Sequence, residues 1–345
     1  MKIRIALVTL IAFSISSAGA KERDTTGVKA PRTFLGVLLQ PRLEIRPRSP
    51  YLDSTRTRWD LHRAEIALRS NPDGKTPRPQ FEFGVDFTDR NLVQDAYISL
   101  PIRRFFRITA GRFKPDFGQD FSMGNQDLLL IDRSRASAFF KAEMGDNRLY
   151  GLEFRGKLPL GFSYCADYMG GPTWRVPQFD PLEFGVATVC WSHGNKIDLR
   201  ASIRTEMVGV HQLLKRRTWW YDLAASGKPI KPLYFECEYF LGDAQLPDYL
   251  PDRRIDSADF VSLSLRFLAA GEWKALNRLM ILPVASIEHT DGYVIRETVT
   301  GGVLCRFGKR LDLYLNGATT WLEKADRFAN HRIGVQISYR EEQTF

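Results

Sequence analysis

Apolar and polar residues alternate along most of this chain. The stretch FEFGVDF at 81–87 shows the pattern clearly: three phenylalanines and a valine fall on one face, and a glutamate, a glycine and an aspartate fall on the other. A period of two is the signature of a β-strand with one apolar side and one polar side. The pattern recurs many times without an obvious second layer to cover the apolar side, so what that side contacts is the first question.

The recurrence predicts an all-β chain in which each strand has about ten residues, a length that suits tilted spans of a bilayer. No helical period persists for three turns, and no linker indicates a second domain. We place sixteen strands at 34–46, 59–69, 80–88, 92–100, 104–113, 147–156, 161–169, 182–191, 196–206, 218–226, 232–241, 258–268, 278–288, 296–306, 310–321 and 331–339.

The connections between these strands differ in length at the two ends. Tight turns such as Asn71-Pro72-Asp73-Gly74 follow most even-numbered strands. Short turns at one rim and long loops at the other are typical of a barrel that spans an outer membrane. Long connections follow several odd-numbered strands, at 114–146, 170–181, 207–217 and 242–257.

The tryptophans fall at or just beyond the predicted strand ends. A β-sandwich would bury tryptophan in the middle of its strands, whereas a membrane barrel carries aromatic girdles at the two interfaces. We therefore predict a sixteen-stranded antiparallel transmembrane β-barrel, and a β-sandwich is the alternative. The tryptophans are Trp59, Trp174, Trp191, Trp219, Trp220, Trp273 and Trp321.

The N-terminus has the features of a cleaved secretory signal. Lys2 and Arg4 precede a short apolar core and a small-residue cleavage pattern, and no later apolar run is long enough for a membrane helix. We predict a signal peptide at 1–20, a short periplasmic segment at 21–32 and a barrel at 33–345. The predicted location is the outer membrane of a Gram-negative-type bacterium.

Residues 61–121 carry a series of motifs in fixed order. An Arg-bearing strand is followed by FEFGVDF, by a DAYI strand at 93–98 and by an "AGRFKPDF" stretch within 108–117. This order resembles the phosphate-selective porin O and P family. The stretch DLLLIDRSRASAFF at 127–140 is similar to that family's third loop, and YFECEYF at 234–240 is similar to one of its later strands.

The resemblance implies an outer-membrane porin that forms a homotrimer and lets small solutes, phosphate or other oxyanions among them, diffuse passively. It also implies that the third loop folds into the pore and forms a constriction; an extracellular lid is the alternative. We expect Leu128 to Ile131 to form an apolar anchor in this loop. The charged residues of that loop are Lys114, Asp116, Asp120, Asp127, Asp132, Arg133 and Arg135.

The chain is basic, with a formal charge of +9 at pH 7, and arginine outnumbers lysine. If the apolar faces contact lipid, the alternate residues line the channel, where arginine would attract anions and offer a planar fork to phosphate or carboxylate. In the second interpretation, arginines and glutamates pair across neighbouring strands and stiffen the wall. The predicted pore-lining residues are Arg42, Arg46, Arg63, Glu65, Arg69, Arg107, Arg155, Arg200, Arg204 and Arg266.

Catalytic motifs are absent from the sequence. It contains no nucleophile elbow, dinucleotide fingerprint or P-loop, and its five histidines lack metal-ligand spacing. We predict no enzyme activity, no cofactor, no metal and no nucleic-acid partner.

Three alternatives stay open: a secreted or periplasmic β-sandwich binding protein, a barrel enzyme that acts on lipids, and a plugged structural barrel. Cys165 and Cys190 lie on neighbouring predicted strands and are either bridged or free.

Overall fold

The computed structural model describes most of the predicted barrel. The predicted signal peptide at 1–20, the segment at 21–32 and the predicted long loop at 170–181, with Trp174, lie wholly or almost wholly outside the described residues. The structure describes residues 33–47, 55–70, 79–89, 92–103, 105–124, 127–143, 148–170, 183–194, 196–210, 214–243, 261–276, 279–292, 295–322 and 328–344.

The described residues form one antiparallel sheet of seventeen strands. Sixteen of these match the predicted strands in order, and β13 is an additional strand of four residues. The strands are β1 (Thr33–Arg46), β2 (Arg56–Ser70), β3 (Gln80–Asp86), β4 (Val93–Arg103), β5 (Phe106–Phe113), β6 (Leu149–Lys157), β7 (Phe162–Gly170), β8 (Glu183–His193), β9 (Ile197–Val210), β10 (Leu214–Ile230), β11 (Leu233–Leu241), β12 (Val261–Gly271), β13 (Trp273–Leu276), β14 (Leu279–Gly292), β15 (Arg296–Phe307), β16 (Leu311–Leu322) and β17 (Phe328–Thr344).

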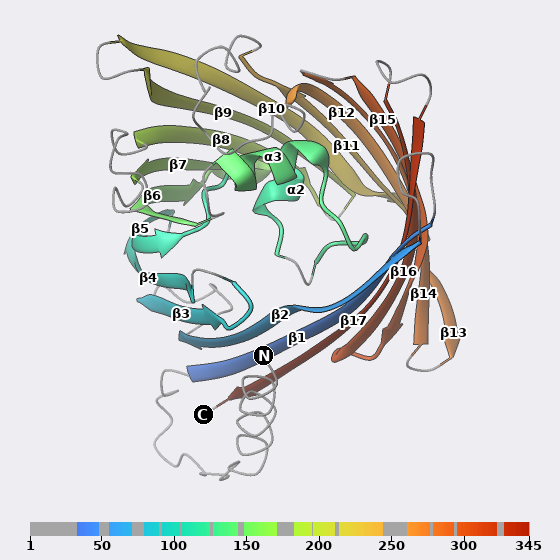
Figure 1. Ribbon diagram of the computed structural model, residues 1–345. Coiled ribbons are helices and arrows are strands. Elements are labelled where there is room, and N and C mark those ends of the chain that lie inside the picture. The colour runs from blue at the N-terminus through green and yellow to red at the C-terminus, as the bar shows by residue number, and fades with distance from the viewer. Residues whose placement is uncertain are drawn as a thin grey trace, which may run out of the picture.

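The sheet closes on itself. Each long strand pairs with its neighbour in the chain, and β1 pairs both with β2 and with β17, so that Leu39 lies between Ala64 and Tyr339. Figure 1 shows the resulting ring of strands. Closure leaves no unpaired edge strand, and the chain therefore forms a sixteen-stranded barrel. The described residues form no second sheet.

The alternation predicted from the sequence sorts side chains between the two faces of this barrel. On β3, Phe81 is 38% exposed and Phe83 is 47% exposed, whereas Asp86 is 1% exposed. Phe267, Ile287 and many other large apolar side chains are likewise exposed on the outside. An apolar surface of this extent on a single chain marks a face that contacts something other than water.

Two helices lie in the long connection between β5 and β6. They are α2 (Gln119–Ser122) and α3 (Arg135–Glu143), and Figure 1 shows them in the space that the strands encircle. We call the connection at 114–148 the β5–β6 segment. A 3-10 turn, η1 (Pro159–Gly161), joins β6 to β7. None of the described helices has the length and apolarity needed to cross a membrane.

Two expectations about β9 and β10 were wrong. The predicted long loop at 207–217 is largely strand, because β9 runs to Val210 and β10 begins at Leu214. Trp220 was placed among the interfacial aromatics, but it lies well inside β10 and is fully buried. Its neighbour Trp219 points outward and is 40% exposed. Consecutive residues of a strand face opposite sides, so both tryptophans of the pair cannot belong to an outer girdle.

Candidate functional site

The polar side chains of the barrel gather on the face that the β5–β6 segment contacts. Gln40 and Arg63 lie opposite each other on β1 and β2, Arg63 contacts Asp86 of β3, and all three side chains are buried. We call this the inner face. The ten residues predicted to line a pore lie on it: Arg42, Arg46, Arg63, Glu65, Arg69, Arg107, Arg155, Arg200, Arg204 and Arg266.

Several of these arginines pair with a glutamate two residues away on their own strand. The Glu44 carboxylate accepts hydrogen bonds from Arg42 at 2.6 Å and from Arg46 at 2.5 Å, and Arg155 donates to Glu153 at 2.8 Å. Residues two apart share a face of a strand, so an Arg-x-Glu spacing produces such pairs directly. These pairs lie within one strand, whereas the second interpretation predicts pairs across neighbouring strands.

Other inner-face arginines find partners on neighbouring strands. Arg69 of β2 donates to the Glu82 carboxylate of β3 at 2.7 Å. Arg107 of β5 donates to the amide oxygen of Gln80, so the partner of this guanidinium is neutral. Arg107 is therefore one position where positive charge on the inner face is not offset by its hydrogen-bond partner.

Arg204 has an aromatic environment. Its guanidinium carbon lies 4.5 Å from the centre of the Phe184 ring and 5.1 Å from that of Phe140, and the side chain is almost fully buried. Contact with ring faces stabilises a desolvated guanidinium. Arg204 therefore packs between the wall and α3, which indicates a structural role for a residue predicted to line the pore.

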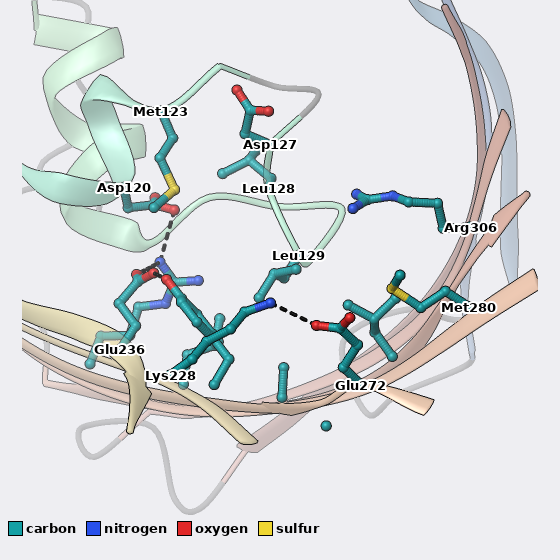
Figure 2. A pocket seen from close by; sticks show the side chains of 16 residues that line it. Asp120, Met123, Asp127, Leu128, Leu129, Lys228, Glu236, Glu272, Met280 and Arg306 are labelled. Atoms are coloured by element: carbon teal, nitrogen blue, oxygen red, sulfur yellow. Dashed lines mark hydrogen bonds and ion pairs between the residues drawn. The ribbon is translucent and has the colours of Figure 1, made fainter. Parts of the chain in front are cut away.

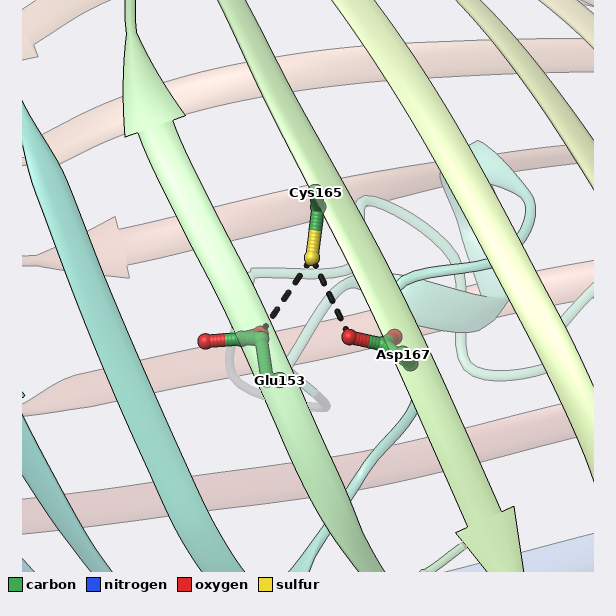
Figure 3. Close-up of side chains that lie close together, drawn as sticks. All are labelled: Glu153, Cys165 and Asp167. Carbon is green, nitrogen blue, oxygen red and sulfur yellow. Dashed lines mark hydrogen bonds between the residues drawn. The ribbon is translucent and has the colours of Figure 1, made fainter.

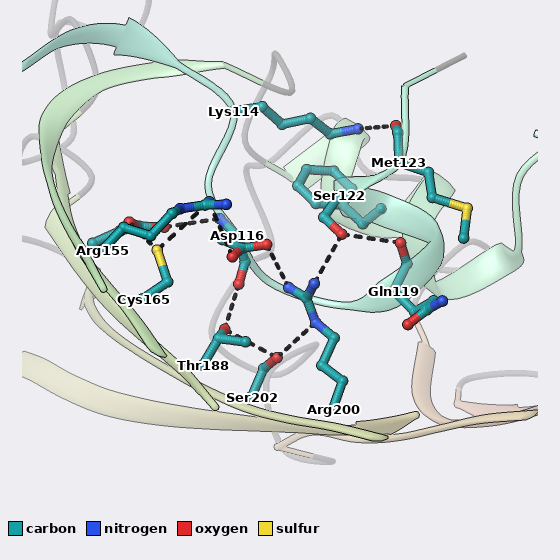
Figure 4. A network of polar contacts seen from close by, with 12 residues as sticks. Lys114, Asp116, Gln119, Ser122, Met123, Arg155, Cys165, Thr188, Arg200 and Ser202 are labelled. Carbon is teal, nitrogen blue, oxygen red and sulfur yellow. Dashed lines mark hydrogen bonds and ion pairs between the residues drawn. The ribbon is translucent and has the colours of Figure 1, made fainter. Parts of the chain in front are cut away.

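Asp116 links the β5–β6 segment to the wall (Figure 4). Its carboxylate accepts hydrogen bonds from Arg155 at 3.1 Å and from Arg200 at 2.7 Å, and its backbone N–H donates to Asp167 at 2.8 Å. Burial alone would raise the pKa of Asp116, but the two guanidinium groups hold it below its usual value. Asp116 is therefore an anion held between two cations.

Helix α2 is attached to β11 and β12 through its first turn. Gly118 has a φ of +71°, which favours glycine, and the N–H groups of Gln119 and Asp120 then point at the Glu238 carboxylate, at 2.7 Å and 3.2 Å. The Asp120 side chain forms an ion pair with Arg266 at 2.8 Å. Burial would raise the pKa of Asp120, but the charge of Arg266 lowers it.

A third attachment precedes α3. Asp132 lies between two arginines of the closing strands, at 3.2 Å from Arg42 of β1 and 2.6 Å from Arg332 of β17. The backbone N–H of Arg135 donates to the Glu288 carboxylate of β14 at 2.7 Å. Contacts therefore run from β6 around the barrel to β17 and β1.

Two cations predicted to belong to a constriction bind the segment's own backbone. Lys114 donates to the carbonyl oxygen of Met123 at 3.0 Å and lies 4.8 Å from the centre of the Phe121 ring. Arg133 donates to the same Met123 carbonyl at 2.7 Å. Burial, and then the charge of Arg133, lowers the pKa of Lys114 to about 6. Lys114 is therefore largely uncharged at neutral pH.

Apolar packing adds to these polar attachments. The stretch Leu128 to Ile131, predicted as an apolar anchor, contacts the inner face of β12 and β14 to β16: Leu130 packs on Leu268, and Ile131 packs on Leu304. Helix α3 contributes two phenylalanines to a separate aromatic cluster. In that cluster the ring of Phe140 lies 5.6 Å from Trp220 and 4.9 Å from Phe240, which explains why Trp220 points inward.

One group of side chains on the wall has the composition of a metal site. The Cys165 thiol lies 3.5 Å from a Glu153 oxygen and 3.2 Å from an Asp167 oxygen, and the three ligand atoms lie within 4.8 Å of one another (Figure 3). Arg155 already donates to Glu153 and lies 3.8 Å from the Cys165 sulfur, so it supplies the group with positive charge. All four cysteines are free, so Cys165 and Cys190 are not bridged.

Several residues of this site were not singled out from the sequence. Glu236 and Glu238 have the same two-residue spacing as the Arg-x-Glu pairs, so that alternation could have placed both on the inner face. The partners of Glu238 in the β5–β6 segment lie more than a hundred residues away in the chain, and no local pattern identifies them. Glu288 and Arg332 were missed for the same reason.

No protein-family model matches this chain, and no curated protein sequence matches it. The resemblance to the phosphate-selective porin O and P family therefore stays a prediction. Solved structures do match. The chain is similar to an anion-selective porin from Comamonas acidovorans, with 12% identity and a TM-score of 0.63 over 90% of this chain and 99% of that one.

Two further solved structures agree with this match. The outer-membrane channel DcaP of Acinetobacter baumannii has 14% identity and a TM-score of 0.59, and the alignment covers 94% of this chain and 100% of that one. OprB of Pseudomonas putida has 10% identity and a TM-score of 0.62, with 90% and 94% covered. At these identities the likeness concerns the fold. The chain has the fold of the outer-membrane porins.

Proposed function

We propose that this protein is an outer-membrane channel through which small solutes diffuse passively. The observation that carries the proposal is the closed barrel of sixteen long strands with large apolar side chains outside and charged side chains inside. In a bilayer every backbone polar group must be paired within the protein, which a closed barrel achieves. Barrels of sixteen strands are wide enough to leave an aqueous channel.

The β5–β6 segment is, in this proposal, the third loop that narrows the channel. Its support is the set of attachments to inner-face residues: Asp116 to Arg200, Asp120 to Arg266 and Asp132 to Arg42. A lid outside the barrel would not need partners in the middle of so many strands. The narrowest passage would then lie between this segment and the inner face of β2 to β5.

A preference for anions is the finer part of the proposal. It is supported by the excess of basic residues in the chain and by inner-face arginines such as Arg107, whose partner is the neutral Gln80 amide. Most other inner-face arginines have carboxylate partners, so we expect a modest preference, with phosphate as one of several oxyanions carried. Assembly as a homotrimer and export by the predicted signal at 1–20 complete the proposal.

The test is reconstitution of the purified protein in a planar lipid bilayer. We expect stepwise increases in current, and a reversal potential under a salt gradient that indicates a few-fold preference for chloride over potassium. Adding phosphate to the chloride solution tests the oxyanion component through a concentration-dependent block. A protein that stays soluble without detergent, or that gives no current steps, would contradict the channel. Gel mobility before and after boiling tests both the barrel and the trimer.

A further inference from the structure

A cavity of about 300 Å³ lies between the β5–β6 segment and the inner face of β10 to β15 (Figure 2). Its volume is at the lower end of the range for small-molecule pockets, roughly 300–1,000 Å³. It lies in the half of the barrel where the connections are short, close to the turns that end β10, β12 and β15. The β5–β6 segment forms one side of the cavity, and the strands form the other.

The floor of this cavity is apolar, unlike most of the inner face. Leu268, Ala270 and Leu282 line it from the wall, and Met280 and Leu129 complete it. Leu130 and Ile131 cover part of the same apolar surface, but Leu129 and Met280 stay partly exposed. Docking of the segment therefore accounts for part of the apolar surface, and the remainder faces the cavity.

Most charged groups around this floor are already paired with one another. Lys228 forms an ion pair with Glu272 at 2.7 Å, and Arg266 contacts Asp120 at 2.8 Å and Glu236 at 3.6 Å. In these pairs the positive and negative charges at the rim of the cavity offset each other. A ligand that needed any of these groups for itself would first have to displace a partner.

Two opposite charges at the cavity remain open to a ligand. Arg306 donates its Nε and Nη2 to Asp312, at 3.0 Å and 3.4 Å, and a guanidinium has five N–H donors in all, so it can donate further. Asp127 has an exposed side chain that forms no ion pair with any described residue. Partial desolvation raises the pKa of Asp127, although the charges of Arg340 and Arg306 act in the opposite direction.

Figure 2 shows how these two groups lie. Arg306 extends from β15 toward the β5–β6 segment, and Asp127 lies on that segment. Both residues line the cavity, as do Leu129 and Met280. Arg306 and Asp127 are not within ion-pair distance of each other. A negative group, a positive group and an apolar surface thus border one cavity, and the two charges leave a gap between them.

We propose that this cavity binds small zwitterions with an apolar body, the class that includes the large apolar amino acids. The ammonium group would bind Asp127, the carboxylate would bind the unused edge of Arg306, and the side chain would cover Leu129 and Met280. The inference rests on the proposed channel and names one class of solute for it. Such a solute carries no net charge, so its selection by this cavity is separate from the anion preference of the inner face.

The first test uses the unmodified protein in planar bilayers at pH 7 with four probes. L-Phenylalanine is the reference, and each of the other three lacks one of its features. L-Phenylalanine has both charges and the apolar body, 3-phenylpropionate lacks the ammonium, phenethylamine lacks the carboxylate, and glycine lacks the apolar body. We expect phenylalanine to reduce the ion current at about tenfold lower concentration than each of the others, a difference of about 1.4 kcal/mol. Equal block by any of the other three would overturn the proposal.

Substitutions assign each charge to its group. Asp127→Asn should remove the advantage of phenylalanine over 3-phenylpropionate, and Arg306→Gln should remove its advantage over phenethylamine. Arg310→Gln is the matched control, because Arg310 is exposed near the same rim and pairs with Glu341 outside the cavity. If Arg306→Gln fails to fold because the pair with Asp312 is lost, the four probes on the unmodified protein and the Asp127→Asn variant still test the proposal. An unchanged ranking of probes in Asp127→Asn contradicts the proposal.

Failure of this inference differs from failure of the channel proposal. A protein that conducts ions but is not blocked by phenylalanine contradicts the cavity and leaves the channel intact. Equilibrium dialysis of phenylalanine against detergent-solubilised protein measures binding without any need for conduction. Saturable binding that is lost in Asp127→Asn supports the site even in a barrel that does not conduct, whereas no saturable binding overturns it.

Discussion

Two sectors of the inner face use the same residue types in different ways. In β2 to β5 the charged side chains find their partners on their own or on neighbouring strands: Arg63 contacts Glu65 and Asp86, and Arg69 contacts Glu82. In β6 to β14 several partners come from the β5–β6 segment. There Arg200 pairs with Asp116, Arg266 pairs with Asp120, and Glu238 accepts two N–H groups from the start of α2.

The difference shows that charged side chains on the inner face have two structural roles, one in each sector. In the first sector both members of each Arg-Glu pair belong to strands of the wall, and their side chains lie on the inner face. In the second sector the pairs attach a long connection to the wall, in addition to its apolar packing. Substitutions in the two sectors should therefore have different consequences for conductance and stability.

Removing part of the β5–β6 segment should give the largest effect. Deletion of 120–135 removes Asp120 and Asp132, the partners of Arg266 and Arg42, so the inner face near them would be open to the interior. We expect single-channel conductance to rise roughly two-fold or more, because a sixteen-stranded barrel without an internal obstruction leaves a wide aqueous channel. An unchanged conductance in a correctly folded barrel would show that this segment is not the constriction.

Removing one cation from each sector compares their energetics directly. Arg266→Met leaves Asp120 and Glu236 buried without their counter-charge, and breaking a buried pair in this way costs about 3–5 kcal/mol. Arg69→Met is the matched change in the first sector, where the side chain is one-third exposed, and a partly exposed pair contributes about 0–1 kcal/mol. Urea unfolding followed by tryptophan fluorescence measures the free energy of unfolding of both variants. Equal losses of stability would contradict the distinction between the two sectors.

The apolar attachment of the segment should matter less than its buried charges. Leu130→Ala removes a buried side chain that packs on Leu268, Ala270 and Val284, and such truncations cost about 2–5 kcal/mol when a cavity remains. We place this site at the lower end, because the segment can shift to close the gap. Limited proteolysis of the segment measures the loosening, and Ile337→Ala on the exposed outer face is the control. If the protease cleaves the segment equally fast in Leu130→Ala and Ile337→Ala, then Leu130 does not attach the segment to the wall.

The smallest predicted effect concerns pH. The pKa of Lys114 is about 6, far below its ordinary value, so lowering the pH from 7.5 to 5 adds a positive charge to the segment. The unfolded chain already holds this proton below its ordinary pKa, so the barrel also loses stability as the pH falls toward 6. We expect the reversal potential to shift by a few millivolts toward anions at pH 5. Lys114→Met should show a smaller shift, and an identical shift would exclude Lys114 as the titrating group.

The sequence predicts the barrel well because alternation is a local property. The strand predicted at 80–88 is β3 at Gln80–Asp86, and its phenylalanines face outward as expected. The prediction for β10 at 218–226 begins late because 207–217 was predicted as a loop, and it ends before Ile230, where the strand ends. Alternation sets the face of each residue, and the aromatic cluster around Phe140 decides which tryptophan is buried.

The site is less predictable because its contacts join distant parts of the chain. The sequence identifies Leu128 to Ile131 as an apolar anchor but not Leu268 or Leu304 as its partners. Likewise, nothing near Lys114 indicates that it bonds to a backbone carbonyl instead of facing the interior. These partners depend on the path of the β5–β6 segment across the barrel, which the alternation pattern does not encode.

The sidedness of β3 tests the central claim most directly. In a cysteine-free background, a nitroxide is attached to Phe83→Cys or to the adjacent Glu82→Cys in protein reconstituted in liposomes. Electron paramagnetic resonance then measures collisions with oxygen, which concentrates in lipid, and with a water-soluble nickel chelate. We predict that oxygen dominates at position 83 and nickel dominates at position 82. Equal access of the nickel chelate to both positions would contradict a barrel with lipid outside and water inside.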